Sequence, residues 1–350
     1  MLSISVTLLF SWWAFRGTDF HQQWLSLKTA NYWVLIPYVT LLLVVHLMRT
    51  WRWGALLSGI ERVPFRKLND ASAIGFMMLI VLPFRLGEFA RPFLIAQRTG
   101  IRRSAAMTTV VLERIVDGIT IAVLLRVLLF FVKVQSPQLD HVRFGANIMF
   151  AIFGGGLAFL LFARWKHDFA VKLVRTVGGW VSPRLAEKVA DIVDTFVGAM
   201  RQLPSPGQTV LFFVFTVAYW GVNGLGAVLL SRAFACSSGA TGCQPMALSV
   251  FQGFVVLSVL VVGLMVPAAP GMMGTFQFAV KVGLSLFIPA AVVGSSGLAF
   301  ANVMWFCQTV QQIGLGLLCM TLGNVSFRDV AGRLGEERPE PTKAVVPTSG

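Results

Sequence analysis

Long apolar runs recur along the whole chain and are separated by short polar segments. Six of these runs approach the length of a membrane span: 1–15, 33–48, 107–131, 144–162, 210–230 and 299–322. An α-helix rises 1.5 Å per residue, so about 20 apolar residues cross a hydrocarbon core about 30 Å thick. The pattern therefore predicts an all-α fold, a polytopic membrane helix bundle with about six full spans in one transmembrane domain over residues 1–325. The first run lacks the basic start and cleavage site of a signal peptide, so we expect a retained first helix.

Two further apolar runs, 69–99 and 246–288, are interrupted in the middle by proline and glycine at Pro83–Gly87 and Pro267–Gly274. Such breaks are tolerated at membrane depth only where the backbone is buried in protein or lines a wet cavity. Full spans precede and follow each run in opposite orientation. This arrangement predicts two re-entrant, broken helical hairpins in an inverted repeat, with a substrate site between them. The alternative is that the breaks are ordinary kinks in two plain helices, since Pro and Gly are frequent in membrane helices.

Composition and charge exclude a soluble domain and indicate the sidedness. Hydrophobic residues make up 56% of the chain and charged residues 13%, against about 25% charged in soluble domains. With the amino terminus inside, nineteen Lys and Arg residues, including Arg49 and Arg52, fall in inner segments and five in outer segments. We expect a multi-pass protein of the bacterial inner membrane with both termini cytoplasmic. The net charge of +14 is spread over loops near the membrane, which favours anionic lipids at the cytoplasmic surface as partners and no nucleic acid.

The polar segments carry weaker signals. Apolar residues at helical spacing over 184–201 fit an amphipathic helix on the inner leaflet, and a simple connecting helix fits equally well. Residues 326–350 are too polar and proline-rich to fold alone and are expected to form a disordered cytoplasmic tail. Cys236 and Cys243 share an expected outer loop, and the sequence leaves open whether they form a disulfide. A homodimer is compatible with the sequence.

Charged residues inside the apolar runs are the candidate site. The first cluster is Arg85, Glu88 and Arg91, and the second is Glu113, Arg114 and Asp117. Ionisable side chains in hydrocarbon cost several kcal/mol unless they are paired or hydrated, so they should face the bundle interior. In one interpretation the arginines hold an anionic head group and the carboxylates position them or receive a proton. In the other, the charges only lock helices together. Arg126 and Lys281 also fall within apolar runs and are further candidates for function.

No reactive or cofactor-binding pattern accompanies these charges. The four histidines are scattered without metal-ligand spacing, and the nucleotide-binding glycine patterns are missing from the sequence. We therefore expect no metal, no cofactor and no catalytic residue, and predict that the protein is not an enzyme.

Two motifs resemble a known family. Residues 83–91 read P-x-R-x-G-E-x-x-R, residues 113–117 read E-R-x-x-D, and residues 267–276 read P-x-x-P-G-x-x-G-T-F. Together they resemble the lysylphosphatidylglycerol synthase transmembrane-region family over nearly the whole chain. That family usually has Glu where this chain has Gln277, which puts proton coupling at this position in doubt. The chain also has no large synthase domain after its last apolar run, so aminoacyl transfer is not expected.

The resemblance implies a lipid transporter or flippase that moves a lipid with an anionic head group by alternating access. The membrane lipid would be a phospholipid, an aminoacyl-phospholipid or a polyprenyl-phosphate-linked glycolipid. The expected substrate-binding residues are Arg85, Gly87, Glu88, Arg91, Glu113, Arg114, Asp117, Pro267, Pro270, Gly271, Gly274, Thr275 and Gln277. Two alternatives remain: a structural or accessory subunit of a lipid or cell-envelope pathway, and an intramembrane lipid-modifying transferase. The sequence does not choose between them by itself.

Overall fold

The computed structural model describes residues 2–82, 87–132, 137–166, 204–235, 246–265 and 270–323, with a few isolated positions between 169 and 187. Several sequence predictions fall outside these residues. They concern Arg85, Pro267, the Cys236 and Cys243 pair, nearly all of the amphipathic segment 184–201 and the tail 326–350.

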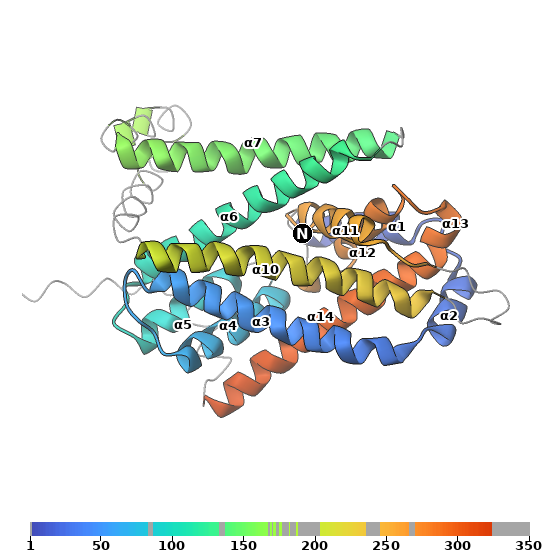
Figure 1. Cartoon of the computed structure of the whole chain (residues 1–350), viewed down its shortest axis with the longest axis horizontal. Coiled ribbons are helices and arrows are strands. Elements are labelled where there is room, and N and C mark those ends of the chain that lie inside the picture. The colour runs from blue at the N-terminus through green and yellow to red at the C-terminus, as the bar shows by residue number, and fades with distance from the viewer. Residues whose placement is uncertain are drawn as a thin grey trace, which may run out of the picture.

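Helices make up the secondary structure of the described residues (Figure 1). The longest are α3 (Leu35–Leu57), α6 (Arg103–Phe130), α7 (Pro137–Trp165), α10 (Pro206–Ser231) and α14 (Leu298–Leu322). Shorter elements are α1 (Leu2–Phe15), α2 (Phe20–Thr29), η1 (Tyr32–Val34), η3 (Arg232–Phe234) and α13 (Ala290–Val292). A π-helical turn, η5 (Val293–Gly297), joins α13 to α14. The all-helical prediction is confirmed.

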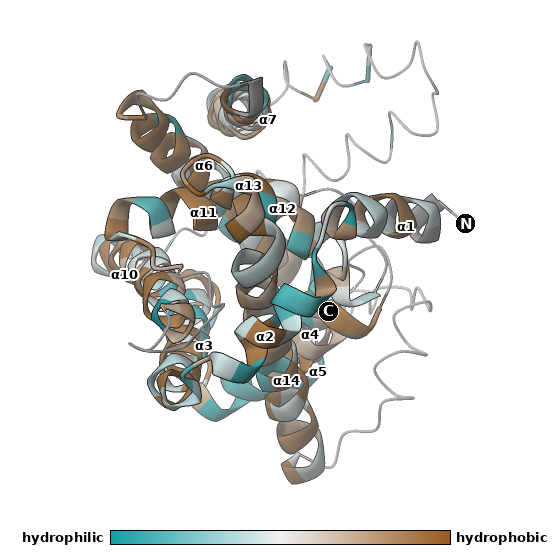
Figure 2. Cartoon of the chain, turned by 90° about the vertical axis from the view of Figure 1, so that its right-hand side faces the viewer, coloured by the Kyte–Doolittle hydropathy of each residue, from teal (hydrophilic) through white to brown (hydrophobic). Residues whose placement is uncertain are grey.

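Four helical segments are long and apolar enough to cross a membrane: Tyr32–Leu57, Leu139–Ala163, Pro206–Phe234 and Ala290–Leu322. The sequence predicted six plain spans, and two of these, α1 and α6, are not among the four segments that are long and apolar enough. Helix α1 has only 14 residues. Helix α6 has 28 residues, but it carries Glu113, Arg114, Asp117 and Arg126. The outward surface nevertheless suits lipid, because large exposed side chains such as Trp33, Phe130, Ile152, Val217 and Phe306 are apolar. Figure 2 shows hydrophobic residues along the same long helices.

Both interrupted runs form pairs of packed helices. The first run contains α4 (Phe65–Val81) and α5 (Ala90–Arg98), and the second contains α11 (Val250–Gly263), η4 (Pro270–Met272) and α12 (Thr275–Leu284). Helix α4 packs on α5, and α11 packs on α12, so neither run is a single kinked helix. Figure 1 shows the two pairs toward opposite ends of the molecule. Helix α4 also contacts η4, so the first pair reaches the break of the second.

A glycine before α5 and a lysine on α12 hold these helices against their neighbours. A Cβ atom on Gly87 would lie 2.0 Å from the backbone nitrogen of Leu79, so only glycine lets the chain before α5 pack directly on α4. Lys281 on α12 donates hydrogen bonds to the carbonyls of Ala14 (2.9 Å) and Arg16 (2.8 Å). An ammonium group at the carboxyl end of α1 satisfies unpaired carbonyls and complements the helix dipole. Lys281 therefore anchors α1, and its place among the candidates for function stays a prediction.

Candidate functional site

A buried ion-pair network joins α3 to α6. Arg52 on α3 donates from both terminal nitrogens to the two carboxylate oxygens of Asp117, and its Nη2–Oδ2 distance is 2.9 Å. Arg52 Nη2 also donates to Glu113 Oε1. The side chains of Arg52 and Glu113 are both 0% exposed. Charges this deeply buried are tolerated because each one has an opposite partner in good geometry.

Two more arginines complete this network. Arg91 on α5 donates from Nη1 to Glu113 Oε2 at 3.2 Å, and its guanidinium lies over the ring of Trp53, 4.4 Å from the centroid. Arg114 Nη2 lies 3.3 Å from Glu113 Oε1 and 3.4 Å from Asp117 Oδ2. Glu113 thus connects the first helix pair to α3 and α6. The Arg91 side chain fits against α4 because residue 75 is glycine; a Cβ there would lie 2.1 Å from Arg91 Cγ.

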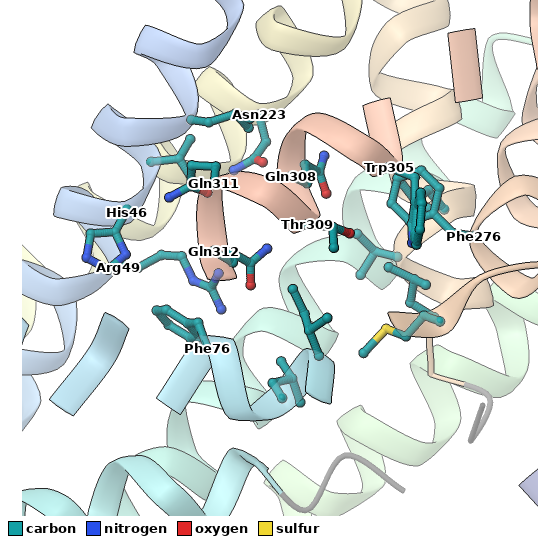
Figure 3. A pocket seen from close by; sticks show the side chains of 18 of the residues that line it. His46, Arg49, Phe76, Asn223, Phe276, Trp305, Gln308, Thr309, Gln311 and Gln312 are labelled. Carbon is teal, nitrogen blue, oxygen red and sulfur yellow. The ribbon is translucent and has the colours of Figure 1, made fainter. Parts of the chain in front are cut away.

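An internal cavity of about 180 Å³ lies beside this network, between the two helix pairs. The first pair contributes Phe76, Leu79 and Ile80, and the second pair contributes Gly271, Met272 and Phe276. Polar side chains from α3, α6, α10 and α14 line the rest: His46, Arg49, Arg114, Asp117, Asn223, Gln308, Thr309, Gln311 and Gln312. Figure 3 shows the labelled members of this set facing a common space. We call this space the polar cavity.

Arg49 is the cavity cation that has no carboxylate partner within the described part of the chain. Its guanidinium lies over the ring of Phe76, 3.5 Å from the centroid, and 5.7 Å from that of Tyr219. Its Nε atom is buried without a hydrogen-bond partner among the described residues. Stacking on π faces holds the side chain in place but leaves its charge available. Figure 3 shows Arg49 reaching from α3 toward Gln312 on α14.

The charges around Arg49 do not cancel within the described residues. Arg49, Arg91, Arg114 and Glu88 line one small space beside α4, and Arg52, Glu113 and Asp117 adjoin it through the ion pairs. Four arginines therefore face three carboxylates. The site as described carries an excess positive charge, which favours an anion.

The second motif borders the polar cavity through its backbone. Gly271 has φ +74° and Gly274 has φ +84°, backbone conformations that residues with a side chain rarely adopt. Trp305 on α14 donates its indole N–H to the Gly271 carbonyl at 2.7 Å, which ties the break to the last span. Pro270 begins this turn. The motif thus shapes a wall with backbone groups and supplies no charge of its own.

Gln277 and Thr275 are buried at the start of α12 and do not line the polar cavity. The side-chain oxygen of Gln277 accepts the Gly274 N–H at 2.7 Å, as the third-position residue of a helix cap does. An amide oxygen accepts this bond as a carboxylate would, which accounts for a glutamine at the position where the family pattern usually has glutamate. Gln277 therefore caps α12, and its expected role in substrate binding stays a prediction.

An apolar groove of about 560 Å³ adjoins the polar cavity. It is lined mainly by Phe15, Phe20, Trp24, Leu27, Met273, Val303, Trp305 and Phe306, from α1, α2 and α14 and the residue after η4. Trp305 lines both spaces. One aromatic side chain therefore separates a polar compartment from an apolar one.

The sequence predicted two charged clusters facing the bundle interior, and the structure brings their described members together. It did not locate two parts of the cavity wall, the end of α3 and the polar face of α14. Glu88, Arg91, Glu113, Arg114 and Asp117 lie together. Arg49 and Arg52 were assigned to an inner loop, but α3 continues to Leu57 and places them inside the bundle. The apolar residues after Arg52 are the signal for this longer helix. The polar residues at 308, 309, 311 and 312, within an otherwise apolar span, are the signal for the α14 wall.

Comparison with protein-family models matches residues 1–310 to the lysylphosphatidylglycerol synthase TM region. The chain belongs to this family. The match covers both helix pairs, the ion-pair network and the α3, α6 and α10 walls of the polar cavity. Membership in the family and the four long apolar helices make this a membrane protein linked to lipid handling. Comparisons with curated proteins and with solved structures each gave no match.

Proposed function

We propose that this family member moves a lipid with an anionic head group across the bilayer and does not catalyse a chemical reaction. The observation that carries the proposal is Arg49, a cation without a carboxylate partner in the described residues, at the wall of an internal cavity between two broken-helix pairs. A guanidinium in such surroundings favours phosphate, because its planar fork matches two phosphate oxygens.

The adjoining apolar groove supports a lipid as the substrate over a small soluble anion. A lipid needs a polar space for its head group and an apolar space for its chains. The polar cavity and the groove provide both, and they meet at Trp305. Membership in a family linked to lipids points the same way.

In the proposed mechanism each helix pair is re-entrant, and the two pairs form an inverted repeat. Alternating access then requires α4–α5 and α11–α12 to open the cavity to one leaflet at a time. Packing of α4 on η4 supports this, because relative movement of these two elements would change the cavity wall. The membrane would be the bacterial inner membrane, with both termini cytoplasmic. The basic residues of the inner segments support that orientation, and moving Arg49 and Arg52 into α3 leaves the bias in the same direction.

The ion-pair network favours a structural role for part of the cluster. Arg52, Glu113 and Asp117 are paired with one another and buried, which suits a lock between α3 and α6. Arg49 lines the polar cavity and has no carboxylate partner among the described residues, which favours a binding role over an ion-pair lock. We therefore assign the lock to these three residues and head-group binding to Arg49.

Reconstitution into vesicles tests the proposal. Phosphatidylglycerol labelled on one acyl chain with a nitrobenzoxadiazole dye is incorporated with the purified protein, and dithionite then bleaches the outer leaflet. We expect protein-containing vesicles to lose the protected inner-leaflet signal faster than empty vesicles. Equal rates would contradict the proposal. Movement of trapped inorganic phosphate without lipid movement would also contradict it, in favour of a small anion.

A further inference from the structure

The lining of the polar cavity limits which head group can bind there, an inference that rests on the proposed function. We propose that the polar cavity selects a phosphate joined to a small polyhydroxylated group, such as glycerol or one sugar ring, and excludes a head group that ends in an ammonium. The hydrogen-bonding groups that surround Arg49 support this preference.

Amides and a hydroxyl form one wall of the cavity. Gln308, Thr309, Gln311 and Gln312 occupy positions on α14 whose spacing places them on one broad helix face. Asn223 lies on the α10 wall, and its Nδ2 donates to the Tyr219 carbonyl at 2.8 Å. An amide offers a donor and an acceptor, and a hydroxyl group needs both. A wall of this composition suits a ligand with several hydroxyls.

Several donors on these walls have no partner among the described residues. They are Arg49 Nε, Trp220 Nε1 and Gln311 Nε2, and all three atoms are buried. Each residue lines the polar cavity, and Trp220 is only 7% exposed. Buried donors are nearly always satisfied, so three unpaired donors beside one cavity leave hydrogen-bonding capacity unused among the described residues.

Among the described residues that line the polar cavity, Asp117 is the one carboxylate, and Glu88 lies in the smaller space beside α4. Both oxygens of Asp117 accept from Arg52, and Arg114 lies beside it. Glu113 is fully buried and accepts from Arg52 and Arg91. Arg49 would repel a second cation. An aminoacylated lipid, which ends in an ammonium, is therefore disfavoured.

The volume limits the size of the head group. The cavity of about 180 Å³ favours a small head group, such as a phosphate with glycerol or one sugar ring, over an oligosaccharide.

Binding of short-chain lipids to the full-length protein in nanodiscs tests the inference. The probes are dihexanoyl phosphatidylglycerol, dihexanoyl phosphatidylpropanol and dihexanoyl lysyl-phosphatidylglycerol, with tryptophan fluorescence as the readout. Phosphatidylpropanol matches phosphatidylglycerol in charge and carbon count but has no hydroxyls. We expect phosphatidylglycerol to bind about tenfold more tightly than phosphatidylpropanol, since two additional hydrogen bonds amount to about one decade in Kd. Lysyl-phosphatidylglycerol should also bind more weakly, because Arg49 repels its ammonium groups.

Substitutions at Gln312 locate the preference. Gln312→Met should remove most of the preference for phosphatidylglycerol over phosphatidylpropanol and keep phosphate binding. Gln312→Glu should instead raise the relative affinity for lysyl-phosphatidylglycerol, because it adds a carboxylate to the wall. Gln97→Glu, an exposed position at the end of α5, is the matched control and should leave all three affinities unchanged.

The outcomes separate this inference from the proposed function. Equal binding of phosphatidylglycerol and phosphatidylpropanol by the unaltered protein would overturn the inference. Tighter binding of lysyl-phosphatidylglycerol would overturn it as well. Neither result would change the rate of protein-dependent lipid translocation in vesicles. That rate tests the proposed function independently of head-group preference.

Discussion

Arg49 and Arg52 lie three residues apart on α3, but carboxylates of α6 enclose Arg52 whereas Arg49 lines the polar cavity. One helix therefore presents two arginines to two environments. Both terminal nitrogens of Arg52 donate to Glu113 or Asp117, and the residue is fully buried and does not line the polar cavity. Arg49 is held by the rings of Phe76 and Tyr219 and keeps its charge. This difference is the basis for assigning a structural role to Arg52 and the proposed head-group binding to Arg49.

Asp117→Asn should destabilise the folded protein strongly. The substitution leaves the buried Arg52 with only Glu113 to balance it, and breaking a buried ion pair costs about 3–5 kcal/mol. We expect a fall in Tm of several degrees in detergent, together with a lower yield of monodisperse protein.

Asp140→Asn on α7 is the control for this change. Asp140 is mostly exposed and lies 3.8 Å from Arg143, so its loss should leave Tm nearly unchanged. If Asp117→Asn melted at the temperature of the unaltered protein, the structural role of the network would be wrong.

Gly87→Ala should disrupt the first helix pair. The new methyl group would meet the α4 backbone at Leu79 and Met78, and backbone atoms cannot move aside as a flexible side chain can. Overpacking of this kind costs about 1–3 kcal/mol. Thermal unfolding of the purified protein measures it.

Gly155→Ala in α7 provides the comparison, since a Cβ at Gly155 meets nothing within 4 Å. It should melt like the unaltered protein. Equal melting of the two variants would show that α4 and the segment before α5 are not packed as described.

The proposed rocking of the two helix pairs predicts that a covalent link between them stops transport. Ile80 and Met272 line the polar cavity from the first and second pairs. In a background without the native cysteines, Ile80→Cys and Met272→Cys would be joined by a short bis-maleimide. We expect the linked double variant to lose translocation and each treated single variant to keep it. Undiminished transport by the linked protein would exclude this movement.

The hydrophobic pattern of the sequence predicted much of the fold. The lengths of the apolar runs predicted helices, and the Pro and Gly breaks marked where α4 and α11 end. Charges in apolar runs marked the cluster of Arg91, Glu113 and Asp117, because such residues must find partners inside the bundle.

The location of the polar cavity depended on tertiary contacts that no local pattern contains. A run that appeared to end at Met48 continues as a helix to Leu57. Arg49 and Arg52 look alike in sequence, and only packing against α6 and α4 distinguishes them. The roles of Lys281 and Gln277 as helix caps also follow from neighbours distant in sequence or from local geometry at a break. Charge alone therefore identified the cluster but not the residue that faces the cavity.

Lipid translocation by two arginine variants tests most directly whether Arg49 holds the head group. Arg49→Gln and Arg126→Gln each remove one arginine from a membrane helix, but Arg126 lies away from the cavity and donates to Asn147 at 3.0 Å. Both would be reconstituted at equal protein density with dye-labelled phosphatidylglycerol. We predict that Arg49→Gln lowers the protein-dependent rate at least tenfold and that Arg126→Gln keeps it within twofold of the unaltered rate. A folded Arg49→Gln variant that moves lipid at the unaltered rate would contradict head-group binding by Arg49.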